Sequence, residues 1–496
     1  MGRITSAAIG VGVLVAGLFA ATAAKAQAGT GCAALTGKAL GAHGTVLSAK
    51  DVAADPAKRL PAYCEVSAVL TPASGSRIGT VFRLPESWNG KILGLGGGGW
   101  AGNVTLAAAA TGLQRGYATA QTDGGHPGTD LWNTDWATNP AAAADFSYRA
   151  IHETALAARQ VVALRYGKPQ THAYYQGCST GGRMGMMEAQ RFPTDYDGII
   201  AGAPVYTLQV QTSAMLRNQA FGAPGAALSV ADLALVNAAV LTACDAADGQ
   251  RDGIVADPRA CRWDPRALAC KPGQQAGQCL APPQVAALRV AYDGVRAKDG
   301  SWAAFPLARG GETGWARFIN AGGAGDVTRG GGMIGLKPLL FGEAQVDMGH
   351  LTPADAAAAR QSAFARDYEA GSPDIRAFAA RGGKLILWHG WSDPGPSPTG
   401  TIDYYEAVRK AAPDTAGNVR LFLAPGVEHC GGGPGADQPD TLTALEAWVE
   451  RGQAPATVVA TRADGPMTRP LCPFPTRARY DGRGGVDDPR SYRCAP

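Results

Sequence analysis

The stretch YYQGCSTGGR, residues 174–183, places a serine between glycines in the pattern Gly-x-Ser-x-Gly. Ser179 falls between a β-rich run, THAYYQGCS, and a helix-forming run, TGGRMGMMEAQRF, which Pro193 ends. A tight turn at this point exposes the hydroxyl above a sheet, and glycines let neighbouring backbone pass closely. In a chain with 67 glycines the pentapeptide arises by chance on the order of a few tenths of a time. The strand-to-helix context therefore carries the prediction that Ser179 is a nucleophile.

The sequence around this turn alternates strand and helix patterns. GTVFRLP, KILGLGGGGW and GYATAQTD are typical of strands, a helix is predicted over 144–167, and DGIIAGAP follows the helix after Ser179 as another strand. The rhythm returns after residue 372 with GGKLILWHGWSDP and NVRLFLAPG. Strand and helix in this alternation predict an α/β fold, a parallel sheet covered on both faces. Residues 205–372 break the rhythm, so we expect a catalytic domain formed by 27–204 plus 373–496 and an inserted lid domain over the carboxyl ends of the strands.

The first 28 residues resemble a leader for export. One early cation, Arg3, precedes an apolar run over 7–21, and small residues then form two Ala-x-Ala patterns. This predicts a signal peptide over 1–26; a permanent membrane anchor is the alternative, but the run is short for a spanning helix. No later stretch is judged apolar enough to span, so no membrane contact of the mature form is expected. The net charge of +4 becomes +2 without Arg3 and Lys25, which favours neither nucleic acid nor an acidic surface as a partner.

The chain has ten cysteines, an even number, and in an exported protein this predicts up to five disulfides. Connectivity does not follow from sequence alone. The short spacings favour the pairs 244–261, 270–279 and 472–494, with Cys32 and Cys64 joining the N-terminal segment. Cys178 and Cys430 then remain as a pair.

A serine nucleophile needs a base and an orienting acid, which in this kind of fold follow in the order Ser, Asp, His, each after a strand. Asp393 follows KLILWHG and His429 follows NVRLFLAPG, so both positions fit. His389 is the alternative base, but it precedes the acid and breaks the order. Asp403 and Asp437 are weaker substitutes for the acid.

Two further features are expected to complete the active site. The backbone N–H of Thr180 and one from the loop LGLGGGGWAGN, taken as Gly98, are predicted to form an oxyanion hole. A phosphate-binding loop is disfavoured because no Gly-Lys-Ser/Thr follows. A Cys178–Cys430 disulfide would fix Ser179 against His429, where a misplacement of about 1 Å costs much of the rate. Cys178 as the nucleophile itself is disfavoured because its side chain should point away from that of Ser179.

These motifs resemble those of the tannase and feruloyl esterase family of secreted α/β-hydrolases. Its hallmark is a Cys-Ser…Asp…His-Cys set, matched by GCSTGG, WSDP and EHCGGG; GGGGWAG and RPLCPFPTRARYDG…YRC match as well. The resemblance runs from Cys32 to Cys494. It implies an α/β-hydrolase fold with a lid, the triad Ser179, Asp393 and His429, and the Cys178–Cys430 disulfide.

A calcium ion is the expected cofactor. Asp245, Asp248 and Asp252 lie on a glycine-bent loop in CDAADGQRDGIVADPRAC, and hard oxygen ligands at this spacing suit Ca²⁺, although a solvated turn is the simpler interpretation. The family resemblance favours a structural calcium here, with backbone carbonyls at Gln250 and Ile254 as further ligands. The spacing is not that of an EF-hand.

The resemblance implies a secreted or periplasmic serine carboxylesterase acting on a small aromatic acyl ester. Hydroxycinnamoyl esters are the first expectation; galloyl esters and the mono-hydroxyethyl half-ester of terephthalate are alternatives. A hydrolase of aliphatic esters or amides is a rival, and so is an exported binding protein that keeps the scaffold without the chemistry. Aromatic residues of the insertion are candidate walls for the acyl group and equally candidate core: Trp302, Phe305, Trp315, Phe318 and Phe341.

Overall fold

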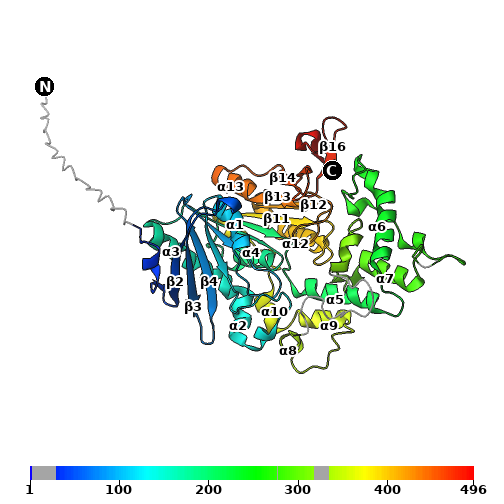
Figure 1. Ribbon diagram of the computed structural model, residues 1–496, viewed down its shortest axis with the longest axis horizontal. Helices are drawn as coiled ribbons and strands as arrows, with labels where there is room; N and C mark the ends of the chain where they lie inside the picture. The colour runs from blue at the N-terminus through cyan, green and yellow to red at the C-terminus, as the bar shows by residue number, and fades with distance from the viewer. Residues whose placement is uncertain (3–28, 276, 318–334) are drawn as a thin grey trace.

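A computed structural model describes residues 1–2, 29–275, 277–317 and 335–496. The predicted signal peptide, 1–26, lies outside the described residues apart from its first two, and so does Phe318. The main strands are β1 Ala39–Leu40, β2 Gly44–Val52, β3 Tyr63–Leu70, β4 Ile78–Pro85, β5 Lys91–Leu95, β6 Ala118–Thr122, β7 His172–Cys178, β8 Gly198–Gly202, β11 Lys384–Gly390 and β12 Val419–Ala424. They form one ten-stranded sheet in the order β1-β2-β3-β4-β6-β5-β7-β8-β11-β12 (Figure 1).

The sheet is mixed. From β6 to β12 all neighbours pair in parallel, whereas β1 to β4 pair antiparallel and β4 also pairs antiparallel with β6. The expectation of a parallel sheet from residue 79 onward is thus wrong for β4. An apolar strand pattern indicates burial but does not encode the direction of the neighbouring strand.

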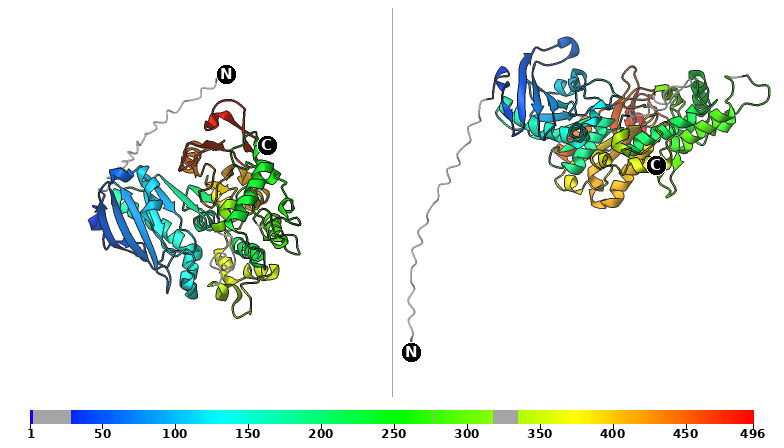
Figure 2. Two further views of the ribbon diagram at one scale, coloured as in Figure 1. Left: turned by 45° about the vertical axis from the view of Figure 1, so that its right-hand side comes forward. Right: turned by 90° about the horizontal axis from the view of Figure 1, so that it is seen from below.

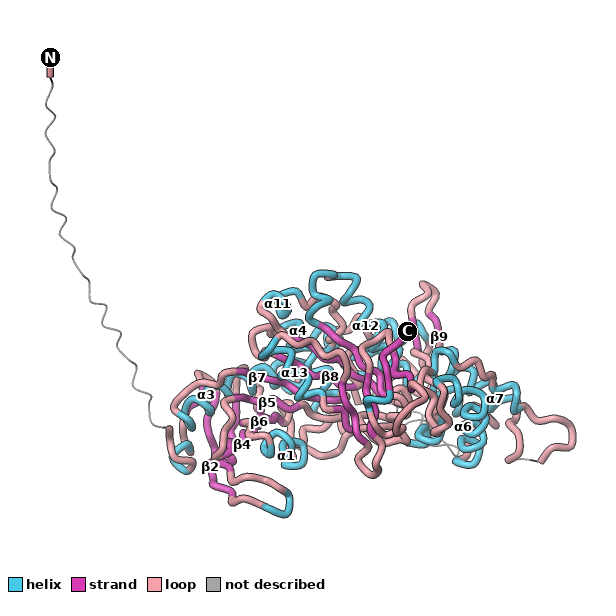
Figure 3. The backbone as a smooth tube through the Cα atoms, turned by 90° about the horizontal axis from the view of Figure 1, so that it is seen from above, coloured by secondary structure: helices cyan, strands magenta, loops and turns pink. Residues whose placement is uncertain are grey.

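Helices cover both faces of the sheet. On one face, α3 Ala150–Tyr166, α4 Thr180–Arg191 and α12 Pro398–Ala411 pack into one apolar cluster; on the other, α1 Leu106–Gln114 and α13 Thr441–Arg451 pack into a second (Figure 3). The helix expected over 144–167 is divided, because α2 Pro140–Ala144 is followed by a π-helical turn, Asp145–Arg149, before α3 begins. The pattern of the fold is that of an α/β-hydrolase, with helices on both faces of a largely parallel sheet.

Between β8 and β11 the chain leaves the sheet and forms a helical part. Its helices are α5 Leu208–Gly222, α6 Val230–Cys244, α7 Pro282–Asp293, α8 Lys337–Phe341, α9 Pro353–Ala359, α10 Ala363–Tyr368 and α11 Arg376–Ala380, with the short hairpin β9 Val295–Arg296 and β10 Trp302–Ala304. Most of this part lies beyond the β11–β12 end of the sheet (Figures 1 and 2). Two apolar clusters hold it, one around α5, α8, α9 and α10 and one around α6 and α7. The domain boundaries at 204/205 and 372/373 remain predictions.

The run Val230–Asp248 is 19 residues long and contains an 18-residue stretch with a mean hydropathy of 1.5, enough by length and composition to cross a membrane. The expectation that no stretch after the leader is apolar enough is therefore wrong for this run. Only 22% of its window is buried, and the helix begins at a Ser229–Asp232 capping box and ends at the disulfide-bonded Cys244. Apolar length alone is weak evidence for a span, because alanine-rich helices of folded proteins reach it too.

The remaining strands form two small C-terminal sheets: β13 Gln438–Pro439, β14 Val458–Thr461 and β15 Thr468–Leu471 form one, and β16 Arg477–Tyr480 and β17 Tyr492–Ala495 the other. Five disulfides join Cys32–Cys64, Cys178–Cys430, Cys244–Cys261, Cys270–Cys279 and Cys472–Cys494. The last three are the pairs that the short spacings favour, and the first two are the expected pairing of the remaining four cysteines. No cysteine of the described chain is left free.

Candidate active site

Ser179 sits on a strained turn between β7 and α4. Its φ of 61° and ψ of −123° lie in a region that a residue with a side chain rarely adopts. Glycines make the turn possible, because a Cβ on Gly177 would lie 2.5 Å from the Gly181 backbone and one on Gly181 would lie 2.9 Å from the Gly97 oxygen. The turn is a nucleophile elbow that lifts the hydroxyl out of the sheet.

The elbow serine, His429 and Asp393 form one hydrogen-bonded chain. His429 Nε2 lies 2.9 Å from Ser179 Oγ, and His429 Nδ1 lies 2.7 Å from Asp393 Oδ2. Asp393 follows β11 and His429 follows β12, so neighbouring parallel strands deliver the acid and the histidine at the same edge of the sheet. The three residues named from sequence are therefore brought together.

The hydrogen bond of His429 Nδ1 goes to Asp393, the first choice for the acid. Asp437 accepts hydrogen bonds from the backbone N–H groups of Gly432 (2.9 Å) and Ala463 (2.9 Å), so it orders the loop after His429. Asp403 lies within α12, where burial raises its pKa to about 6.

His389, the alternative base, contacts Asp393, as the catalytic His429 does. It is fully buried, its Nε2 is 3.1 Å from both Asp393 Oδ2 and the Pro396 carbonyl, and its Nδ1 is 2.8 Å from Thr401 Oγ1. The two acceptors around Nε2 make that nitrogen the protonated one. Sequence order excluded His389 as the base but gave no sign that it also holds the acid.

Asp393 is a buried carboxylate that is kept ionised. Burial disfavours the charge, but the charge of His429 and the hydrogen bonds from His389 and His429 outweigh it and hold the pKa of Asp393 at about 2. Its second oxygen accepts the backbone N–H of Gly395 at 2.8 Å. A permanently ionised acid suits the orientation of a histidine that gains a proton during catalysis.

A buried arginine, unforeseen from sequence, links the inserted part to the loop of Asp393. Arg217 of α5 is 1% exposed and donates hydrogen bonds to the carbonyl oxygens of Gly395 (2.8 Å) and Phe305 (3.2 Å). Burial lowers its pKa to about 10. The contact joins residues 178 positions apart, so no local pattern could have indicated it.

The glycine loop after β5 packs directly on the elbow. The Thr180 hydroxyl donates a hydrogen bond to the Gly99 carbonyl at 2.7 Å, and a Cβ on Gly96 would meet Gly181 Cα at 2.4 Å. Thr180 is the first residue of α4, so its N–H is one of those that a helix leaves without an intrahelical acceptor. Gly98 lies between these contacts, and its role as the second oxyanion donor stays a prediction.

The Cys178–Cys430 disulfide joins the residue before the serine to the residue after the histidine. The two Cα atoms are 5.9 Å apart, although the residues are separated by 252 positions. Cys430 has a φ of 64° and Ser179 one of 61°, so each of the two joined loops has a residue with a positive φ next to the disulfide. A covalent bond here removes the freedom of the two loops to move apart.

The aspartate loop after α6 is closed by Cys244–Cys261 and suits a hard cation. Asp245 accepts the backbone N–H groups of Asp252, Gly253 and Ile254 at 3.2–3.3 Å, and Asp248 accepts that of Gln250 at 2.9 Å. Asp252 Oδ1 is buried without a hydrogen-bond partner among the described residues, whereas its Oδ2 pairs with Arg469 at 3.2 Å.

The electrostatics of the loop agree with that fit. Burial, together with the charges of Asp252 and Asp245, raises the pKa of Asp248. An orphaned buried carboxylate oxygen among mutually repelling carboxylates fits the ligands that Ca²⁺ takes.

Two of the aromatic residues considered as acyl-pocket walls are core. Trp315 is 1% exposed and packs against Phe221 and Tyr292, and Phe305 is 3% exposed and packs against Trp302. By contrast Leu131 and Trp132 are 44% and 43% exposed, and Leu131 accepts a hydrogen bond from the backbone of Trp100 next to the glycine loop.

A serine on an elbow, a histidine and a buried aspartate, on a largely parallel sheet with helices on both faces, define a serine hydrolase of the α/β-hydrolase class. The family model described as "Tannase and feruloyl esterase" matches residues 64–310 and 344–495. The chain belongs to the tannase and feruloyl esterase family, and it is a carboxylic ester hydrolase.

Relatives within the family are similar over most of the chain. A mono(2-hydroxyethyl) terephthalate hydrolase of Piscinibacter sakaiensis is 36% identical, covering 88% of this chain and 86% of the relative. A probable feruloyl esterase of Arthroderma benhamiae is 35% identical, covering 83% and 81%. The crystal structure of feruloyl esterase B from Aspergillus oryzae superposes with a TM-score of 0.83 at 26% identity, covering 94% of this chain and 99% of that one.

Proposed function

We propose that the protein hydrolyses esters of small aromatic carboxylic acids, with hydroxycinnamoyl esters as the preferred class. The hydrogen-bonded chain from Ser179 through His429 to Asp393 is the observation that carries the proposal. The names of the relatives support an aromatic acyl group, and so does the exposed apolar pair Leu131 and Trp132 beside the glycine loop. The galloyl ester and the terephthalate half-ester are the alternatives. The half-ester is the substrate named for a relative, and the word tannase in the family description supports the galloyl ester.

In this mechanism His429 Nε2 takes the proton of Ser179 Oγ as that oxygen bonds to the ester carbonyl carbon. The tetrahedral intermediate collapses when the alkoxide leaves, taking the proton back from His429, and the acyl group stays on Ser179. Water then gives a proton to His429 as its oxygen bonds to the acyl carbon. The second tetrahedral intermediate collapses by breaking the bond to Ser179 Oγ, which takes the proton from His429, and the carboxylic acid is released. Asp393 remains ionised throughout and stabilises the imidazolium.

The oxyanion of each intermediate is assigned to the backbone N–H of Thr180 and to a second N–H of the glycine loop, for which Gly98 is our choice. The donors belong to two loops that the Thr180–Gly99 hydrogen bond fixes against each other. Preorganised donors of this kind each lower the activation barrier by about 3 kcal/mol.

The aspartate loop is assigned to a structural Ca²⁺ held by Asp245, Asp248 and Asp252 with the carbonyls of Gln250 and Ile254. A bound cation would neutralise the loop and order the segment between the two cysteines; no catalytic step passes through it. The five disulfides support an oxidising compartment, and the leader sequence supports export to the periplasm or the medium.

Turnover of methyl ferulate, methyl gallate, mono(2-hydroxyethyl) terephthalate and an aliphatic butyrate ester by the wild type and by Ser179→Ala tests the proposal. We expect methyl ferulate to have the highest kcat/KM and the variant to be inactive. Preference for butyrate would contradict the aromatic acyl assignment while keeping the mechanism. Full activity of Ser179→Ala would overturn the assignment of the nucleophile.

A further inference from the structure

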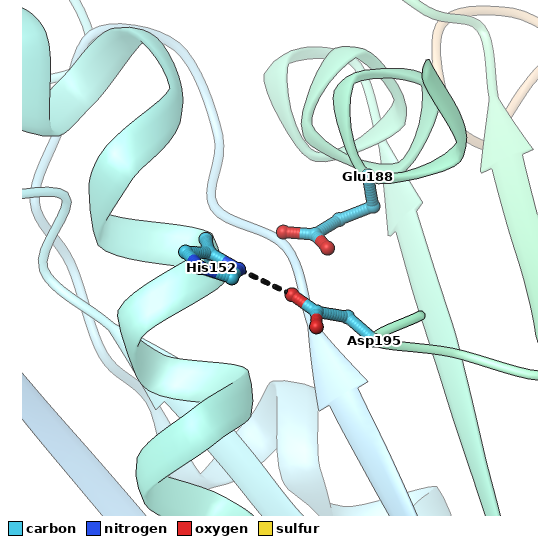
Figure 4. A group of neighbouring side chains, drawn as sticks. All are labelled: His152, Glu188 and Asp195. Carbon is cyan, nitrogen blue, oxygen red and sulfur yellow. Dashed lines mark hydrogen bonds and ion pairs between the residues drawn. The ribbon is translucent and has the colours of Figure 1, made fainter. Parts of the chain in front are cut away.

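Three ionisable side chains converge at a place that catalysis does not use. His152 lies in the first turn of α3, Glu188 in the last turn of α4, and Asp195 between α4 and β8 (Figure 4). Each offers a ligand atom, and these atoms lie within 4.8 Å of one another. Glu188 is nine residues beyond Ser179, so the His152–Glu188–Asp195 cluster is about 13 Å along α4 from the nucleophile.

Glu188 is a buried carboxylate in an unusual environment. Its side chain is fully buried, and neither carboxylate oxygen has a hydrogen-bond donor in the described chain. Figure 4 shows the carboxylate pointing towards His152 and Asp195. Burial, with the charge of nearby Asp195, raises the pKa of Glu188 well above its ordinary value. A buried carboxylate without a donor costs several kcal/mol, so we expect a positive charge, a proton or a hydrogen-bond donor from solvent at this place.

The neighbours of the cluster are arranged as they are around metal ligands. Arg159 holds Asp195 through Oδ1 at 3.4 Å and through the Thr194 carbonyl at 2.8 Å, which leaves Asp195 Oδ2 facing His152. The imidazole of His152 stacks on Phe192, with ring centroids 3.9 Å apart and planes 11° apart. Partners of this kind fix the orientation of ligating carboxylates and imidazoles. The His152 side chain is 24% exposed and offers a path for an ion from solvent.

We propose that His152 Nδ1, Glu188 and Asp195 Oδ2 form a second cation site, selective for a borderline divalent ion such as Zn²⁺. One imidazole nitrogen and two carboxylates are ligands that Zn²⁺ takes with bonds of about 2.0–2.2 Å, and a fourth position remains for water. Two carboxylates balance the charge of the ion. Ca²⁺ is excluded because it takes six to eight oxygen ligands.

The competing explanation is a proton shared between Glu188 and Asp195. Such a proton would form a hydrogen bond between the two carboxyl groups, and His152 would not be needed. A cation uses all three groups, because His152 Nδ1, which lies 2.5 Å from Asp195 Oδ2, must give up its proton and bind the ion. His152 is therefore the residue that separates the two explanations.

The test is zinc binding by the full-length mature protein, saturated with Ca²⁺ so that the aspartate loop cannot take zinc. The protein is stripped with a chelator, reloaded with calcium, titrated with Zn²⁺ by calorimetry and analysed for metal content after gel filtration. The variants are His152→Ala and Glu188→Gln. His350→Ala is the matched control, because His350 also pairs with an aspartate, Asp347, at 2.8 Å but lies exposed in the inserted part.

We expect one equivalent of zinc in the wild type and in His350→Ala, and loss of that equivalent in His152→Ala. Glu188→Gln should lower zinc affinity at least tenfold. Absence of a stoichiometric zinc in the wild type would overturn the proposal and leave the shared proton, and zinc retained in His152→Ala would place the ion elsewhere and overturn it too. Should Glu188→Gln fail to fold, the partly exposed His152→Ala decides alone. The readout is metal content, so it does not depend on the esterase activity.

Discussion

Replacing His389 by alanine removes one of the two imidazoles that hold Asp393. His389 Nε2 donates to Asp393 Oδ2 over 3.1 Å in a site that water does not reach, since His389 is 0% and Asp393 1% exposed. A hydrogen bond to a charged group contributes about 1.5–3 kcal/mol. At about 1.4 kcal/mol per factor of ten, the expected fall in kcat is about 10- to 100-fold. KM should change little, because His389 does not touch the substrate.

The pH dependence of stability should change as well. Because the pKa of Asp393 is lowered to about 2, its contribution to stability is present above the unfolded value of 3.8 and is lost as the pH falls through about 2. His389 helps to lower that pKa, so in His389→Ala the contribution shrinks and acid unfolding moves to higher pH.

The assay is steady-state hydrolysis of methyl ferulate from pH 5 to 9, with acid unfolding followed by circular dichroism. His389→Gln should recover much of the lost kcat, because its amide N–H groups can reach Asp393 and the Pro396 carbonyl. Ile386→Ala is the control on the same strand, three residues earlier and fully buried; it should lower the melting temperature but keep kcat. If His389→Ala kept its kcat, or if Ile386→Ala lost as much, His389 would be packing only and the reasoning would be refuted.

Three further predictions follow from the same contacts. Gly181→Ala places a Cβ 2.9 Å from the Gly97 oxygen and should lower kcat about 100-fold by displacing the elbow, which steady-state kinetics would detect; unchanged kcat would show that the loops can separate. The double variant Cys178→Ser/Cys430→Ser should have lower activity and a lower melting temperature, because it removes a loop closure that contributes several kcal/mol to stability. The control variant Cys270→Ser/Cys279→Ser should keep its activity. Removal of calcium with a chelator should lower the melting temperature, and readdition should restore it; no shift in a thermal scan would contradict a structural calcium.

The triad was predictable because its signals are local. Ser179 lies in a five-residue pattern at a strand-to-helix junction, and Asp393 and His429 each follow a recognisable buried strand. The order along the chain then assigns their parts. Three of the disulfide pairs were predictable for a similar reason, because their cysteines are only 9 to 22 residues apart.

What could not be predicted depends on contacts between distant parts of the chain. Arg217 reaches the loop of Asp393 from the inserted part, and His389 contacts Asp393 through a rotamer that only the packed core fixes. The antiparallel edge of the sheet is similar: β6 enters between β4 and β5, and strand patterns alone do not specify this neighbour. The sequence pattern predicts Glu188 to be an ordinary polar residue on an amphipathic helix, and only the packing shows that it is buried.

The Cys178–Cys430 bond also determines what a protease can do to this protein. Residues 205–372, the predicted insertion, lie between these two cysteines along the chain. Any single cut within it therefore yields two fragments that stay covalently joined, one carrying Ser179 and the other carrying Asp393 and His429. A nicked enzyme would run as two bands only after reduction, and its serine and histidine would still be held side by side.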